Sequence, residues 1–103
     1  MADFIKVATL DEVPPGEMKL VEVDGKEIVL ANVDGQIYAF DNTCTHRGGP
    51  LHEGELTGDV VECPWHGGRF NVKTGEVVGP PPSRPIATYQ VQVEGSEIRL
   101  ARP

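Results

Sequence analysis

The 103-residue chain has few of the residues that build most active sites, with two cysteines, three histidines and one tryptophan. No segment follows the pattern G-x-G-x-x-G, so the sequence gives no sign of a dinucleotide-binding loop. No run of 18 apolar residues occurs, and we therefore expect no membrane-spanning helix. The first six residues, MADFIK, lack the apolar core of a signal peptide, which leads us to expect a soluble protein of the cytoplasm.

Turn-forming residues are abundant, with twelve glycines and nine prolines, while hydrophobic residues make up 39% of the chain. This composition is typical of short strands joined by turns rather than of helices. The length is sufficient for one small domain with its own core. We therefore expect a single domain over residues 1–103.

The formal net charge is −7. An acidic surface argues against a nucleic-acid partner, because phosphates would repel it. It suits attraction towards a protein partner with a basic patch. The charge is explained equally well by solubility, so by itself it favours neither interpretation.

Alternating apolar and polar residues predict short strands separated by turns. Two Asp-Gly pairs, at 24–25 and 34–35, are signals for tight hairpins, so the strands around them form an antiparallel meander. Thr9 and Glu12 have the spacing of a capping box, which predicts one helical turn. The polar segment 51–59 is expected to be turn-rich. The predicted strands cover residues 4–8, 18–23, 26–33, 36–40, 60–62, 69–72, 87–93 and 96–100.

The side chains best suited to bind a metal lie in two short motifs. The sequence reads C-T-H over residues 44–46 and C-P-W-H over residues 63–66, so the motifs hold both cysteines and two of the three histidines. Two thiolates and two imidazoles suit zinc or an iron–sulfur centre. A zinc finger usually pairs two cysteines in one knuckle and two histidines on a helix, whereas here each motif supplies one of each. A zinc module, or two thiols without metal, is therefore the weaker interpretation.

The two motifs resemble the paired cluster-binding boxes of the Rieske [2Fe–2S] proteins, in which two histidines replace two cysteines on one iron. The resemblance implies that Cys44 and Cys63 bind the buried iron. It also implies that His46 and His66 bind the outer iron. Glycines follow both motifs, where a backbone without Cβ atoms can approach the bridging sulfides. These glycines are Gly48, Gly49, Gly67 and Gly68.

Two departures from the high-potential members of that family predict a low reduction potential. Those relatives carry a serine and a tyrosine whose hydroxyls donate hydrogen bonds to the cluster sulfurs, and the matching positions here are Gly68 and Phe70. They also carry one extra cysteine in each box, and this chain has no further cysteine. We therefore expect a potential at the low end of the Rieske range, roughly −150 mV.

Four further residues near the motifs have open roles. Trp65 either shields its loop or forms a docking contact, since aromatic residues are favoured at interfaces. Arg47 either balances the charge of the reduced cluster or faces solvent. His52 is expected to be a surface residue. The proline-rich segment 79–85, which includes Pro81, is expected to pack beside the cluster, as the proline loop does in the similar ferredoxins.

The resemblance implies an all-β fold, with a Rieske-like antiparallel β-sandwich as base and a small cluster-binding subdomain inserted at about residues 42–76. It implies a Rieske-type ferredoxin, similar to the ferredoxin component of bacterial aromatic-ring-hydroxylating dioxygenase systems. Such a protein passes single electrons from a flavin-dependent NAD(P)H ferredoxin reductase to a terminal oxygenase and is not catalytic alone. We expect it to be a monomer.

Two other interpretations come from different classes of protein. One is a small redox or structural subunit of a nitrite-reductase-like enzyme, whose relatives often lack the four ligands that this chain retains. Stable co-purification with a large subunit would support it. The other is the structural zinc module, which requires zinc and no acid-labile sulfide.

Overall fold

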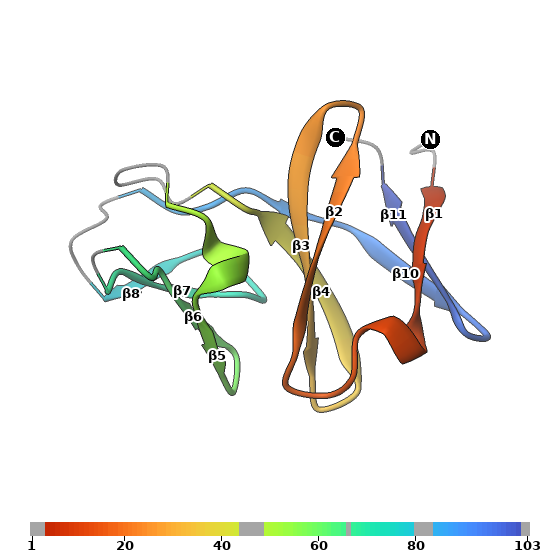
Figure 1. The fold of residues 1–103 in the computed structure, drawn as a ribbon, viewed down its shortest axis with the longest axis horizontal. Coiled ribbons are helices and arrows are strands. Elements are labelled where there is room, and N and C mark those ends of the chain that lie inside the picture. Colours follow the sequence, from red (N-terminus) through yellow and green to blue (C-terminus); the bar gives the residue numbers. More distant parts are fainter. Residues whose placement is uncertain (1–3, 44–48, 66, 80–83, 102–103) are drawn as a thin grey trace.

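The computed structural model describes residues 4–43, 49–65, 67–79 and 84–101, and the regular secondary structure of these ranges is almost entirely antiparallel strands (Figure 1). They contain no α-helix, and neither short 3-10 helix among them is long and apolar enough to cross a membrane. The all-β class expected from the sequence is confirmed. The elements are β1 (Phe4–Thr9), η1 (Leu10–Glu12), β2 (Met18–Val23), β3 (Lys26–Val33), β4 (Gln36–Asp41), η2 (Leu51–Glu53), β5 (Glu55–Thr57), β6 (Val60–Glu62), β7 (Arg69–Asn71), β8 (Val77–Gly79), β9 (Thr88–Tyr89), β10 (Val91–Glu94) and β11 (Glu97–Ala101), where η marks a 3-10 turn.

The strands form three sheets, which we name by position. The outer base sheet has the order β1-β11-β10, the central sheet has the order β2-β3-β4-β9, and the small sheet has the order β5-β6-β7-β8. Figure 1 shows the small sheet at one end of the molecule, the outer base sheet at the other end and the β2–β4 meander between them. The outer base sheet and the central sheet thus form the expected sandwich, and the small sheet is inserted between β4 and β9.

Strand β3 is buried on both of its faces, because every residue from 28 to 33 is buried. Ile28 and Leu30 pack in one apolar cluster with Ile98 and Leu100 of the outer base sheet. The alternate residues of β3 pack in a second cluster against the small sheet. Its main members are Val29, Ala31, Val33, Phe40, Leu51, Val61, Phe70 and Val72. The near-continuous apolar run of β3 is typical of a strand with packed layers on both sides.

The two Asp-Gly hairpins are confirmed. Val23 pairs with Lys26 across the first turn, and both turn residues have positive φ, 52° at Asp24 and 82° at Gly25. Positive φ at both central positions is the requirement of the type I′ turn, whose twist matches that of the flanking strands.

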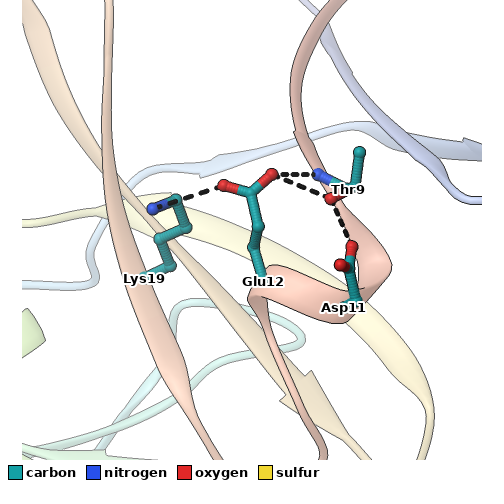
Figure 2. A network of polar contacts seen from close by, with 4 residues as sticks. All are labelled: Thr9, Asp11, Glu12 and Lys19. Carbon is teal, nitrogen blue, oxygen red and sulfur yellow. Dashed lines mark hydrogen bonds and ion pairs between the residues drawn. The ribbon is translucent and has the colours of Figure 1, made fainter.

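The predicted helical turn at Thr9 is confirmed as η1, and Figure 2 shows the contacts at its start. Glu12 accepts hydrogen bonds from the backbone N–H of Thr9 at 2.9 Å and from its hydroxyl at 2.8 Å. Lys19 on β2 lies 3.5 Å from the same carboxylate. The hydrogen bonds from Thr9, followed by the charge of Lys19, lower the pKa of Glu12.

One local prediction was wrong, and two short strands were not predicted. The predicted strand 87–93 is divided into β9, which belongs to the central sheet, and β10, which belongs to the outer base sheet. Alternation continues through a strand that changes sheets, so the sequence pattern does not reveal the break. The segment 51–59 contains η2 and β5, and residues 77–79 form β8. These three-residue strands are too short to show a period and depend on pairing within the small sheet.

Replacing Leu30 by alanine is expected to lower the free energy of unfolding by about 2–5 kcal/mol, because it leaves a cavity in a fully buried layer. Urea denaturation of the two proteins measures this difference. Val93→Ala is the control, since that side chain is 44% exposed and its loss should cost about 0.5 kcal/mol or less. Equal effects of the two substitutions would contradict the assignment of β3 as the double-sided core strand.

Candidate metal centre

Of the four proposed ligands, the structure describes Cys63. The other three, and several of the neighbouring candidate residues, lie outside the described residues: Cys44, His46, His66, Arg47, Gly48 and Pro81. Within the ranges that are described, no three metal-ligating side chains converge. The evidence for a centre therefore comes from Cys63 and from the segments that begin and end each loop.

Cys63 follows β6 directly and is a free cysteine that is only 2% exposed. It belongs to the apolar cluster between the central and small sheets, together with Val61 and Phe70. Its backbone N–H donates to the carbonyl of Gly68 at 2.7 Å, and its carbonyl accepts from the N–H of Gly67 at 3.1 Å. These two bonds close the second motif into a tight turn at the end of the β6–β7 hairpin, so the sulfur is held by the core rather than by a loose loop.

The end of the first motif's loop touches this sulfur. A Cβ atom added at Gly49 would lie 2.7 Å from Cys63 Sγ, closer than real Cβ atoms approach, and 3.2 Å from Trp65 Cδ2, which is a tight contact. Gly49 comes three residues after His46, so the segment that follows the first motif lies against the cysteine of the second motif, although the two are far apart in sequence. Only glycine leaves room for the backbone of one loop to lie against the thiol of the other.

The base of the first loop is closed by backbone pairing. Thr43 and Pro50 form an antiparallel bridge, and the N–H of Leu51 donates to the carbonyl of Asn42 at 2.7 Å. Leu51 is fully buried in the same apolar cluster as Cys63. The segments on both sides of the first motif are therefore fixed to the scaffold.

The proline-rich segment is also anchored on both sides. The backbone of Gly79 packs against the side chain of Arg69, since a Cβ atom added at Gly79 would be 3.0 Å from Arg69 Nε. On the other side, the N–H of Ile86 donates to the carbonyl of Gly75 at 2.9 Å. Both contacts attach the segment to the β7–β8 region, next to the second motif.

Strand β9 follows the proline-rich segment and returns to the strand that leads into the first motif. The hydroxyl of Tyr89 donates to Asp41 Oδ1 at 3.2 Å. Partial burial, and then the neighbouring carboxylate of Asp41, raise the pKa of Tyr89 to about 12. The phenol therefore keeps its proton, and this bond persists, at any ordinary pH.

The remaining predicted residues fall into two groups. Gly68 and Phe70 are buried beside Cys63, and neither has a hydroxyl group. Trp65 is 56% exposed, with its ring beside Gly49, so it is a large aromatic surface at the point where the loops meet.

Two residues were misjudged or missed at the level of sequence. His52 was expected to be a simple surface residue, but it is partly buried and its ring lies 2.9 Å from Asn42 Oδ1. Asn42 was not singled out, although it is one of two buried polar residues in the ranges described. An asparagine before a turn is a common feature and gave no signal of this burial.

The donor chemistry of the site fits an iron–sulfur centre. A buried thiol next to a backbone without a side chain is a position for a thiolate ligand, and close backbone amides are the usual partners of cluster sulfurs. Apolar side chains on the core side of the thiol would keep water away from it. The described residues therefore fit the [2Fe–2S] group that the two motifs suggest.

Comparison with known proteins agrees with this fit. The family described as Rieske [2Fe-2S] domain matches residues 3–90. The chain is 45% identical, over 96 residues, to the biphenyl dioxygenase ferredoxin subunit of Pseudomonas sp. (strain KKS102), with 92% of this chain and 88% of that protein covered.

Solved structures show the same likeness. The ferredoxin of carbazole 1,9a-dioxygenase from Nocardioides aromaticivorans IC177 superposes with a TM-score of 0.93 at 36% identity, covering 97% of this chain and 98% of that chain. A chain in a complex of reduced oxygenase and oxidized ferredoxin in carbazole 1,9a-dioxygenase superposes with a TM-score of 0.90 at 38% identity, covering 95% and 92%.

Replacing Gly49 by alanine is expected to reduce the amount of bound cluster strongly, because the methyl group would collide with Cys63 Sγ. The overpacking itself should cost about 1–3 kcal/mol of stability. Iron and acid-labile sulfide per chain, with the unfolding free energy, measure the two effects separately.

Gly58→Ala is the matched control for this substitution. Gly58 has a φ of 61° with open space around it, so alanine there is strained by about 1–2 kcal/mol without touching the thiol. It should lose stability and retain its cluster. A Gly49→Ala protein with the iron and sulfide content of the wild type would refute the close contact.

Proposed function

Because the chain belongs to the family of Rieske [2Fe–2S] domain proteins, we propose that it is an electron carrier that serves a terminal oxygenase of the aromatic-ring dioxygenase type. Cys44 and Cys63 bind one iron of its cluster, and His46 and His66 bind the other. When bound, the cluster supplies reversible transfer of one electron. The contact between Gly49 and Cys63 Sγ carries this proposal, since it brings the segment that follows the first motif against the buried thiol of the second.

Other residues of the chain exclude water from the site, hold the thiol in place and influence the reduction potential. The apolar cluster that includes Leu51, Val61 and Phe70 covers the Cys63 side of the site and excludes water there. The backbone turn between Cys63 and Gly68 keeps the thiol in place while the charge of the site changes. The absence of hydroxyl groups at Gly68 and Phe70 leaves the potential low, since no side chain there donates to the cluster sulfurs.

Trp65 is proposed to form a docking contact for the oxygenase. It is 56% exposed where the loops meet, and a tryptophan that is partly open in the free protein is the usual anchor of an interface. The net charge of −7 favours a partner surface with a basic patch. A weak and short-lived contact is sufficient, because each encounter transfers one electron.

The electron is proposed to come from a flavin-dependent NAD(P)H ferredoxin reductase, which docks at the same end of the molecule. The protein is then not catalytic by itself and works as a monomer in the cytoplasm. Within the described ranges the exposed large apolar side chains are Trp65, Val78 and Val93, which form no broad apolar surface for a permanent partner.

Protein purified without air is expected to contain about two iron ions and two sulfides per chain and, after reduction, to give a rhombic EPR signal with an average g below the free-electron value. Its midpoint potential is expected at roughly −150 mV. A colourless protein that contains zinc and no sulfide would overturn the proposed function. A midpoint well above zero would refute only the low-potential assignment.

Trp65→Ala is expected to weaken productive docking by about tenfold or more, because the substitution removes a large side chain that becomes buried when the partner binds. Stopped-flow reduction of the terminal oxygenase of a biphenyl dioxygenase system, at several ferredoxin concentrations, measures the effect. Val93→Ala is the control, as an exposed apolar residue on β10 of the outer base sheet. Equal rates for both variants would place docking elsewhere. The midpoint potential should be the same in all three proteins.

A further inference from the structure

Asn42 lies between the end of β4 and the first cluster motif, two residues before Cys44, and is only 3% exposed. Buried amides occur where both ends of the group have hydrogen-bond partners. Here both the backbone and the side chain of Asn42 form hydrogen bonds, and their partners lie in two separate segments.

The first segment is β3 of the central sheet. The backbone N–H of Asn42 donates to the carbonyl of Glu27 at 3.1 Å, and Asn42 Nδ2 donates to Glu27 Oε1 at 3.2 Å. The start of the first loop is thus attached by two bonds to the strand that is buried on both faces.

The second segment is η2, on the far side of the loop. The carbonyl of Asn42 accepts from the N–H of Leu51 at 2.7 Å, and Asn42 Oδ1 accepts from the N–H of His52 at 2.9 Å. The His52 ring nitrogen Nδ1 also lies 2.9 Å from Oδ1. The backbone N–H of His52 can only donate, so the side-chain atom of Asn42 that faces His52 is the oxygen Oδ1. Because this oxygen can only accept, Nδ1 of the His52 ring carries the hydrogen in their contact.

The side chain of Asn42 therefore connects three points: β3, the start of the loop and its end. Backbone pairing could close the loop with any residue at position 42, since it uses only main-chain atoms. The carboxamide of Asn42 also fixes the orientation of the loop ends relative to each other, because its oxygen bonds to η2 while its nitrogen bonds to β3. A rigid base is what a loop needs to present ligands with fixed geometry.

We propose that Asn42 is a positioning residue for the iron–sulfur centre: its carboxamide joins Glu27 on β3 to His52 in η2 and so fixes the loop that carries Cys44 and His46. This inference rests on the proposed ligand set. Asn42 does not touch the cluster in this proposal; it acts through the orientation of the loop.

Three substitutions separate the two ends of the amide. Asn42→Ala removes both. Asn42→Asp retains the acceptor for His52 but sets a carboxylate against the carboxylate of Glu27. Combining Asn42→Asp with Glu27→Gln restores a hydrogen bond between the two side chains with the donor and acceptor exchanged.

Asn32→Ala is the matched control. Asn32 is the other buried polar residue in the described ranges, 4% exposed, and its amide also makes two hydrogen bonds, to the carbonyl of Val13 and from the N–H of Gly35, both at 2.8 Å. It lies near the opposite end of β3 from Glu27, and the partners of its amide, Val13 and Gly35, belong to neither motif. It should cost a similar amount of stability for reasons unrelated to the cluster.

The experiment measures the rate of cluster loss from the oxidised protein in the presence of an iron chelator, together with the EPR g values and the midpoint potential. Asn42→Ala should lose its cluster at least about tenfold faster than the wild type, because the loop that carries two of the proposed ligands loses its side-chain attachment to β3 and η2, and its EPR signal should broaden or shift. Asn32→Ala should match the wild type in both readouts. Asn42→Asp should lose its cluster quickly, and the double variant should return to within about threefold of the wild type.

Two negative results have different meanings. If the wild type binds a Rieske-type cluster but Asn42→Ala and Asn32→Ala behave alike, the positioning role of Asn42 is wrong and the proposed function stands. If the wild type itself binds no iron and sulfide, both fail. Should Asn42→Ala not accumulate as folded protein, the comparison of Asn42→Asp with the double variant decides, because equal rates of cluster loss in these two proteins would also overturn the role.

Discussion

The burial of β3 on both faces is the constraint on which the rest of the structure depends. Ile28 and Leu30 pack towards the outer base sheet, while Val29 and Ala31 pack towards the small sheet. One strand thus serves as a wall for two separate apolar layers. Because protein interiors are close-packed, neither layer can move against the central sheet without opening space in a core. The small sheet is therefore a fixed part of the domain rather than a mobile appendage.

The described residues of the candidate metal centre are held in place by the packing around β3. Cys63 is itself a member of the layer between the central and small sheets, and Asn42 is attached to β3 through Glu27. The described residues at the ends of the loops are paired with the scaffold by backbone hydrogen bonds. This is an economical way to hold a site, since a binding geometry is more reliable when its supports are packed strands.

Exposure and charge complement this rigid interior. The large aromatic surface of Trp65 lies where the two loops meet, and the net charge of −7 is available to orient a basic partner over longer distances. Electrostatic attraction increases the rate of encounter more than the final affinity. Such a surface suits a carrier that must bind and leave repeatedly.

The sequence alone determined the features that depend only on residues close together in the chain. The two Asp-Gly turns require positive φ at adjacent positions, and the spacing of the Cys and His residues within each motif indicates the ligand chemistry; both are local. It could not determine that β9 and β10 belong to different sheets, that Gly49 lies against Cys63 Sγ, or that Asn42 joins β3 to η2. A period of two residues shows that a side chain is buried but not which partner buries it. Those partners are distant in the chain, so only the packing of the three sheets decided them.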